Sequence, residues 1–454
     1  MLSLWFESAL LPSGWERRVR ITARDGRIAA VTVGTAAHPD DERHAIAVPG
    51  LPNVHSHAFQ HGLAGLTERR APGADSFWSW RELMYQFVER LGPEELEAIS
   101  AWCFAGMLEG GFTHVGEFHY LHHDQDGVPF AERGELAARV AAAAAASGIG
   151  LTLLPVFYAH SGFGGQAPTA RQRRFITDPE GFARIVEGCR RAVQPLAGAS
   201  VGVAPHSLRA VTPPELSAVV ALAGDGNIHM HIAEQTREVE ECLSWCGQRP
   251  IAWLLDAQPV DERWCLVHAT HATGAELDQL AQRRAVIGLC PITEASLGDG
   301  IFPAVHWRSQ RGRFGVGSDS NVMTDAAVEL RTLEYSQRLA ERARNVLADG
   351  TSASTGRSLF EAALAGGTQA LQRTAAAVGL APGASLDLVT LAPAHPALLE
   401  RQGDEILDSW VFAAGREAID CVWRAGERLV SGGRHRDRER LIARYARALQ
   451  RLRA

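Results

Sequence analysis

The sequence predicts an α/β protein: a (β/α)8 barrel of the TIM type, with a small β-sandwich domain built from both chain ends. Two observations support this prediction. Between residues 48 and 379, apolar strand-like runs alternate with helical stretches, and eight such units fit a barrel with insertions. Residues 1–47 and 380–432 instead contain short β-like runs separated by turn signals. Two β-rich ends around a long middle therefore indicate one composite domain beside the barrel.

The remaining tail, residues 433–454, has the pattern of a basic amphipathic helix. We expect this C-terminal helix to pack on the body of the protein or at a subunit contact. A doubly wound open sheet is the alternative to the barrel for the middle of the chain. No GxGxxG motif follows a first strand, so dinucleotide binding has no support.

The composition limits the classes of function. The chain has 454 residues, 46% hydrophobic and 21% charged, which excludes a disordered chain, a collagen and a coiled coil. Its 45 Lys and Arg against 52 Asp and Glu give a net charge of −7, which argues against nucleic-acid binding. The 7 scattered cysteines do not suggest a disulfide framework, and no signal peptide or long apolar run is evident. We expect a soluble, cytoplasmic protein with no membrane partner.

Histidines and acids gather where the predicted strands end. His55 and His57 form a His-Ser-His motif, and the strand period of two points both imidazoles to one face. Further candidates follow later strands, namely His229, His231, His268 and Asp319. Histidines and a carboxylate at the C-terminal end of one barrel form a ligand set suited to Zn²⁺, with room for a water. Glu234 lies opposite His231 by strict alternation, unless the strand end turns there.

Several longer motifs carry a resemblance to a known family. PGLPNVHSHAFQHGLAGLTERR, EFHYLHH, PHSLRAV, HIAE, VHAT, CPITEASLGDGIFP and GVGSDSN resemble the deaminase branch of the amidohydrolase superfamily, and within it the formimidoylglutamate deiminases. The resemblance spans residues 50–330. It implies hydrolysis of N-formimino-L-glutamate to N-formyl-L-glutamate and ammonia in histidine degradation. The superfamily's habit also implies a homodimer.

The resemblance implies a role for each strand-end residue. One Zn²⁺ would be bound by His55, His57, His231 and Asp319, although Fe²⁺ or Mn²⁺ suits the same ligands. His229 would be a core histidine, one layer deeper in the barrel. The catalytic groups would be Glu234 as proton shuttle, His268 as the polarising histidine and Asp319 as a base.

Substrate recognition requires other residues. A small molecule with two carboxylates calls for arginine, whose planar fork binds a carboxylate through two hydrogen bonds. We expect the substrate-binding residues to be Gln60, Arg81, Tyr120, His206 and Arg209. Arg81 lies in the aromatic stretch 76–85, which we expect to be a loop over the mouth of the barrel. Three further histidines are expected only to pack within a loop: His119, His122 and His123.

Two other functions remain open from the sequence. The first is another deaminase of the same branch, acting on a guanine-, cytosine- or adenosine-like ring, because Trp78 and Trp80 could stack on such a ring. The second is a metal-dependent amide hydrolase, or a barrel that only binds a ligand. The complete set of candidate metal ligands argues against a purely binding role.

Overall fold

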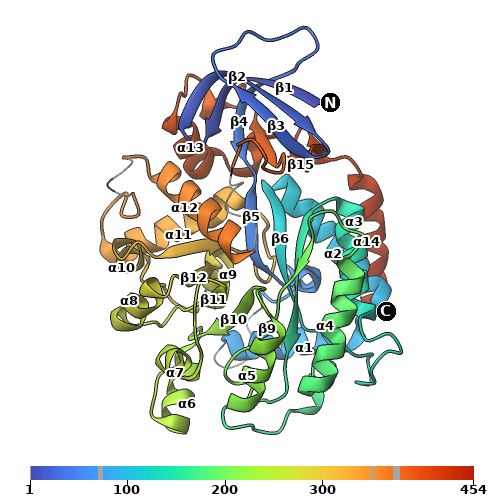
Figure 1. Cartoon of the computed structure of the whole chain (residues 1–454). Coiled ribbons are helices and arrows are strands. Elements are labelled where there is room, and N and C mark those ends of the chain that lie inside the picture. Colours follow the sequence, from blue (N-terminus) through green and yellow to red (C-terminus); the bar gives the residue numbers. More distant parts are fainter. Residues whose placement is uncertain (1, 70–74, 349, 351–352, 372–378, 454) are drawn as a thin grey trace.

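The computed structural model describes residues 2–69, 75–348, 350, 353–371 and 379–453. Figure 1 shows a sheet of terminal strands at one end of a barrel and helix α1, Phe77–Arg90, at the opposite end. The barrel sheet has nine short strands in the order β10-β11-β12-β13-β5-β6-β7-β8, with β9 on β7. Their bounds are β5 Leu51–Ser56, β6 Phe112–His119, β7 Gly150–Phe157, β8 Ser200–Val201, β9 Ala204–Pro205, β10 Ile228–Ile232, β11 Trp264–His268, β12 Val286–Leu289 and β13 Arg313–Val316.

The barrel closes between its fourth and fifth strands. β8 and β9 together fill the fourth position. They are separated near Gly202, where a side chain would meet the Asn227 carbonyl oxygen. Val203 N–H donates to the Asn227 carbonyl at 2.9 Å, and His229 N–H donates to the Val203 carbonyl at 3.0 Å. All adjacent strand pairs of this sheet are parallel, so the predicted (β/α)8 barrel is confirmed.

Helices cover the barrel and begin with recognisable capping signals. Thr212 and Thr273 form capping boxes with Glu215 and Glu276, which satisfies backbone N–H groups at the helix starts. The helices after α1 have the bounds α2 Pro93–Glu109, α3 Glu135–Ser147, α4 Pro179–Val193, α5 Pro213–Leu222, α6 Thr236–Cys246, α7 Pro250–Ala257, α8 Gly274–Gln282, α9 Pro291–Leu297, α10 Ala304–Ser309, α11 Ala326–Glu341, α12 Thr355–Ala370 and α13 Asp404–Ser409.

The two chain ends form a second sheet in the order β17-β16-β15-β14-β4-β1-β2-β3. Its far edge bonds to the segment before β14, where Ile28 N–H donates to the Ala384 carbonyl at 2.8 Å. The domain expected to be a sandwich is thus one eight-stranded sheet with a cluster of buried apolar side chains that includes Phe6 and Val19. The domain limits drawn near residues 47 and 380 stay a prediction. The strands are β1 Leu2–Leu11, β2 Gly14–Arg24, β3 Arg27–Thr32, β4 Glu42–Pro49, β14 Leu388–Leu391, β15 Ile419–Arg424, β16 Glu427–Ser431 and β17 Arg434–His435.

The aromatic stretch expected to be a loop is a helix, so that prediction was wrong. It forms most of α1, Phe77–Arg90, which follows the N-cap residue Ser76. The Ser76 hydroxyl accepts from Trp78 N–H at 3.3 Å, and Ser79 Oγ accepts from Ser76 N–H at 2.9 Å. Buried residues at helical spacing, such as Phe77 and Met84, then turn one face toward the barrel mouth.

The basic tail forms α14, Arg438–Arg453, and packs on α2. Arg444 pairs with Glu97 at 2.6 Å and Arg451 with Glu95 at 2.6 Å. Its arginines therefore face acids of the body, as expected for a helix packed on this protein. In the described part of the chain, no helix is both long and apolar enough to span a bilayer.

Candidate active site

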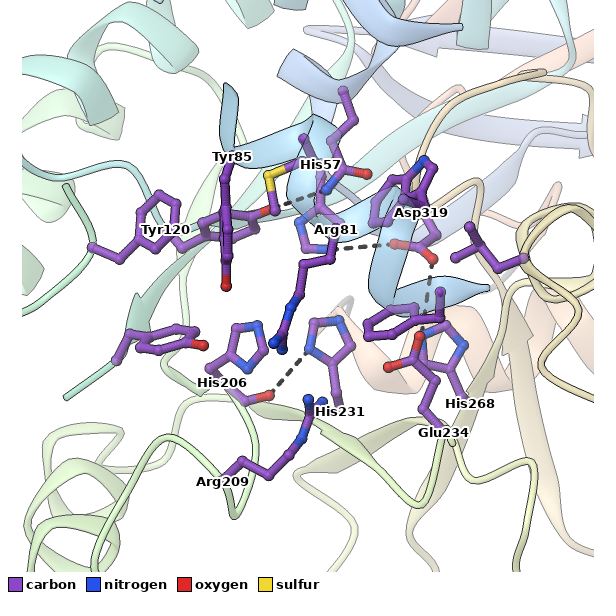
Figure 2. Close-up of a pocket in the computed structure, with 17 residues that line it drawn as sticks. His57, Arg81, Tyr85, Tyr120, His206, Arg209, His231, Glu234, His268 and Asp319 are labelled. Carbon is purple, nitrogen blue, oxygen red and sulfur yellow. Dashed lines mark hydrogen bonds and ion pairs between the residues drawn. The ribbon is translucent and has the colours of Figure 1, made fainter. Parts of the chain in front are cut away.

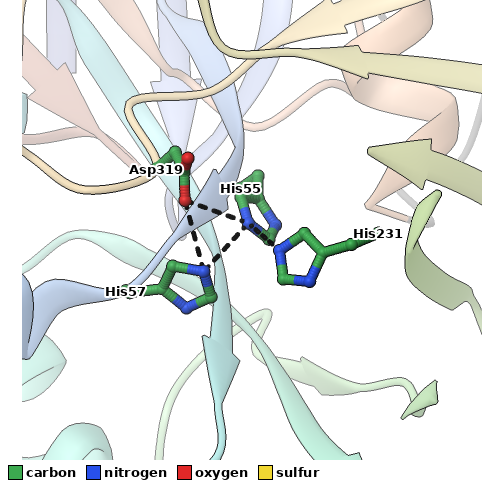
Figure 3. Close-up of side chains that lie close together, drawn as sticks. All are labelled: His55, His57, His231 and Asp319. Atoms are coloured by element: carbon green, nitrogen blue, oxygen red, sulfur yellow. Dashed lines mark hydrogen bonds and ion pairs between the residues drawn. The ribbon is translucent and has the colours of Figure 1, made fainter. Parts of the chain in front are cut away.

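Four side chains converge at the C-terminal end of the barrel, from β5, β10 and the turn after β13 (Figure 3). His55 Nε2 lies 3.2 Å from His57 Nε2 and 3.0 Å from His231 Nε2. Asp319 Oδ1 lies 3.3 Å from His55 Nε2 and 3.2 Å from His57 Nε2. These are the four residues that the sequence indicated as metal ligands, and the structure brings them together.

Backbone contacts fix the direction of two of these imidazoles. His57 Nδ1 lies 2.9 Å from the Phe118 carbonyl, and His231 Nδ1 lies 3.1 Å from the His206 carbonyl. A carbonyl only accepts, so each Nδ1 carries the proton and each Nε2 lone pair faces the cluster. Burial lowers the pKa of His55 to about 3, which keeps that imidazole neutral. Neutral imidazoles with their second nitrogen held by a carbonyl are the usual form of metal-binding histidine.

Asp319 is placed by a network that joins the first and last barrel strands. Its N–H donates to the His55 carbonyl at 3.0 Å, and its own carbonyl accepts from His57 N–H at 2.9 Å. Asn321 Nδ2 donates to the same carbonyl at 2.9 Å. Asp319 and Asn321 both have positive φ, of 45° and 57°, so the chain turns sharply here. This turn aims the Asp319 carboxylate back at the histidines.

Glu234 also reaches the pocket through a turn. Ala233 has a φ of 49°, which breaks the strand alternation after β10 and re-aims the next side chain. The Glu234 carboxylate then lies 3.9 Å from His268 Nε2. Burial raises the pKa of Glu234 above its ordinary value, which suits a group that takes up and releases a proton.

His268 lies beside the cluster, with three carboxylates around its ring: those of Glu234, Glu294 and Asp319. Its Nε2 lies 3.9 Å from Asp319 Oδ2, and its Nδ1 lies 3.1 Å from Glu294 Oε1. Glu294 in turn accepts from Cys290 N–H at 2.8 Å, which anchors it. Burial acts to lower the pKa of His268, but the neighbouring carboxylates, Glu234 first, raise it to about 10. A divalent cation at the cluster would oppose that rise.

The cluster forms one end of a pocket, and the expected substrate-binding residues line the rest of it. In Figure 2, Asp319, Glu234 and His268 gather on one side, while Tyr85 and Tyr120 stand on the other. Gln60 donates through Nε2 to the Tyr120 hydroxyl at 2.8 Å. The structure brings together all five residues named from the sequence: Gln60, Arg81, Tyr120, His206 and Arg209.

The two arginines approach the pocket from different elements. Arg209 follows β9, is 5% exposed, and has Glu238 as an ion partner at 3.9 Å. Arg81 comes from α1 and lies over the Trp78 ring, 4.6 Å from its centroid. The Nε atoms of both arginines are buried and have no hydrogen-bond partner among the described residues. The pocket therefore offers N–H donors of two cations to an anionic ligand.

Some pocket residues were not foreseen from the sequence. Met84 and Tyr85 enter from α1, and Tyr158 and Phe175 enter from the segments after β7. Little in the sequence marks these residues as part of a site, because isolated aromatic residues usually indicate core packing. Glu238 and Glu294 were also missed, since a glutamate near a helix start usually lies in solvent.

Three of the four histidines expected to pack contact backbone carbonyls away from the cluster, and the fourth, His119, is buried with no partner for its Nε2 among the described residues. His229 Nε2 lies 2.8 Å from the Ala370 carbonyl, in the barrel interior. His122 and His123 contact the carbonyls of Val156 and Ile176 at 2.7 and 2.8 Å.

Comparison with known proteins agrees with this geometry. The model of the amidohydrolase family matches residues 46–429, and the model of the N-terminal domain of formimidoylglutamate deiminase HutF matches residues 3–45. A formimidoylglutamate deiminase of Pseudomonas aeruginosa is 47% identical over 99% of both chains. The chain belongs to the formimidoylglutamate deiminase branch of the amidohydrolase family. It is therefore a hydrolase that acts on C–N bonds.

Solved structures of this family have the same fold. The crystal structure of an amidohydrolase from Brucella melitensis superimposes with a TM-score of 0.97, at 53% identity and full coverage of both chains. An adenosine deaminase from Xanthomonas campestris, solved with bound zinc, has a TM-score of 0.82 at 24% identity over 100% of this chain and 98% of its own. The second likeness shows the shared fold alone.

Proposed function

We propose that this protein hydrolyses N-formimino-L-glutamate to N-formyl-L-glutamate and ammonia, with one Zn²⁺ ion. The observation that carries the proposal is the two-ended pocket. A cluster of three histidines and Asp319 lies in one part of it, and Arg81 and Arg209 line another part, each with a buried Nε that has no hydrogen-bond partner among the described residues. The identity to the Pseudomonas aeruginosa deiminase supports the same substrate.

The four-residue cluster fits a divalent metal on chemical grounds. The Nε2 lone pairs of His57 and His231 point toward His55 Nε2 from 3.2 and 3.0 Å, so three ring nitrogens face one small space beside Asp319. Three nitrogens and one carboxylate oxygen match the ligand preference of zinc. His55, His57, His231 and Asp319 would hold the ion. When bound, it would lower the pKa of a water in the site toward about 7 and so supply hydroxide near neutral pH.

The side chains beside the cluster move the protons. Glu234 takes a proton from the attacking water and delivers it to the substrate nitrogen that leaves as ammonia. Its raised pKa suits both halves of that cycle. His268, held by Glu294 at 3.1 Å, orients the oxygen that adds to the formimino carbon. Asp319 would help to hold the metal, and its second carboxylate oxygen could accept a proton from the attacking water.

The far end of the pocket favours a linear dicarboxylate over an aromatic ring. Each guanidinium can bind a carboxylate through two parallel hydrogen bonds. Gln60 and Tyr120, linked at 2.8 Å, and the half-buried His206 add further polar contacts. A neutral ring would leave the buried Arg209 charge without an added partner, which is unfavourable in a site removed from water.

Ammonia release tests the proposal. The zinc-loaded protein is assayed with N-formimino-L-glutamate and, separately, with guanine, cytosine and adenosine. We expect fast release from N-formimino-L-glutamate alone. Release from a ring substrate only would replace the proposal with the ring-deaminase alternative, and release from none would remove it. The homodimer is a separate prediction, which light scattering tests by measuring the molar mass of the protein in solution.

A further inference from the structure

Glu238 is a fully buried carboxylate that the mechanism above does not use. It lies on α6, one helical turn after Glu234. Its Oε1 accepts from Ala233 N–H at 3.1 Å, and its Oε2 accepts from Glu234 N–H at 3.2 Å. The same Oε2 lies 3.9 Å from Arg209 Nη2. The Glu238 carboxylate therefore has two contacts. It binds the backbone at Glu234, the proposed proton carrier, and it pairs with the guanidinium of Arg209.

The first contact stabilises an unfavourable backbone turn. Ala233 has a φ of 49°, in the left-handed region that residues other than glycine rarely adopt. Such a turn persists only where the surroundings fix it, and Glu238 binds both N–H groups that the turn exposes. Without the turn, strand alternation would point Glu234 away from the face that carries His231. The direction of Glu234 thus depends on Glu238.

The second contact orients Arg209. Its guanidinium lies between the Glu238 carboxylate and the Trp78 ring, whose centroid is 5.7 Å from Arg209 Cζ. Arg209 Nε has no hydrogen-bond partner among the described residues, so Glu238 is the carboxylate whose distance to the guanidinium marks an ion pair. Burial acts to lower the pKa of Arg209, and Glu238 and Glu234 raise it, so the guanidinium stays charged.

We propose that Glu238 is a positioning residue that sets, through one carboxylate, both the direction of Glu234 and the direction of Arg209. This inference rests on the proposed function, because it assigns the Glu234 end to proton transfer and the Arg209 end to a substrate carboxylate. Glu238 does not touch substrate. Its removal is therefore expected to change kcat through Glu234 and KM through Arg209.

The test compares Glu238→Gln with a matched control, Glu276→Gln. Glu276 is also buried near the start of a helix, accepts from a backbone N–H, that of Thr273, and pairs with Arg249 at 3.2 Å, but it does not line the pocket. Glutamine keeps the size of the side chain but offers one acceptor oxygen, so one N–H at the Ala233 turn loses its partner.

We expect Glu238→Gln to lower kcat about tenfold or more and to raise KM about threefold, with full metal content, because small misplacements of catalytic groups are costly. Glu276→Gln should leave both kinetic constants near wild type. Equal behaviour of the two variants would overturn the proposal. If Glu238→Gln does not fold, Glu238→Asp keeps the charge but withdraws the carboxylate, and it should show the same pattern.

A double variant separates the two contacts. In an Arg209→Ala background, Glu238→Gln should still lower kcat but should no longer raise KM, because its partner is gone. Additive effects on KM would contradict a link through Arg209. Failure of the proposed function is recognised separately, since the wild-type protein would then release no ammonia from N-formimino-L-glutamate.

Discussion

The two ends of the active-site pocket are built in different ways. At the metal end, the side chains come from strand ends and adjoining turns, and backbone groups fix His57, His231 and Asp319. At the carboxylate end, the side chains come from helix α1 and from loops, and the Nε atoms of Arg81 and Arg209 have no partner among the described residues. The side chains of the metal end are therefore held in place by the protein before substrate binds. The arginines of the carboxylate end gain hydrogen-bond partners only when a substrate carboxylate binds.

Removal of the metal should have the largest effect, because the metal end supplies the nucleophile. Treatment with a chelator is expected to abolish ammonia release, and added Zn²⁺ should restore it. Metal content by atomic emission, measured with activity, checks this. Full activity of the metal-free protein would show that the reaction does not need a metal at the histidine cluster.

The next largest effect is expected for Glu234→Gln. Glutamine cannot carry the proton, so kcat should fall by about a hundred- to ten-thousandfold, while metal content and KM stay near wild type. Steady-state kinetics with a metal assay measure both. A near-normal kcat would remove Glu234 from the mechanism.

Arg209→Ala tests whether the other end of the pocket binds a substrate carboxylate. It removes a buried donor to the substrate carboxylate, so KM should rise about thirtyfold or more, equivalent to about 2 kcal/mol. Metal content should not change, because Arg209 is not one of the four residues that would hold the ion. Unchanged KM with full metal loading would contradict the assignment of this end to carboxylate binding.

The smallest effect is expected for Tyr120→Phe. The variant removes the hydroxyl that accepts from Gln60 at 2.8 Å, and one such bond contributes about 1 kcal/mol. We expect kcat/KM to fall about fivefold through KM. Tyr445→Phe, whose hydroxyl lies 3.4 Å from the His61 carbonyl outside the pocket, is the control and should have no kinetic effect. Equal kinetics of both variants would place Tyr120 outside substrate recognition.

The same contrast explains what the sequence could predict. The barrel and the metal cluster follow from short local patterns, such as the His-Ser-His spacing at the end of β5, because parallel strands bring their carboxyl ends to one place. The turn at Ala233 could be named only as an option, since alternation alone points Glu234 to the wrong face. Its cause, the buried Glu238, depends on a fold that the spacing does not specify.

The carboxylate end was predicted less completely. The sequence predicted Arg81, but its segment, expected to be a loop, forms helix α1 with a capping box at Ser76. Tyr85 and Tyr158 were missed because they meet only after α1 and the segment after β7 pack together. Residues that form a site through tertiary packing of distant segments carry no local pattern.

We propose that one pocket joins a metal-dependent deimination end to a dicarboxylate-binding end. The most direct test is to compare ammonia release from N-formimino-L-glutamate with release from N-formiminoglycine, which has the same reacting group but lacks the side-chain carboxylate. We predict that kcat/KM is lower for N-formiminoglycine by about a hundredfold or more, because one buried guanidinium then lacks its partner. Equal kcat/KM values for the two amidines would contradict the account.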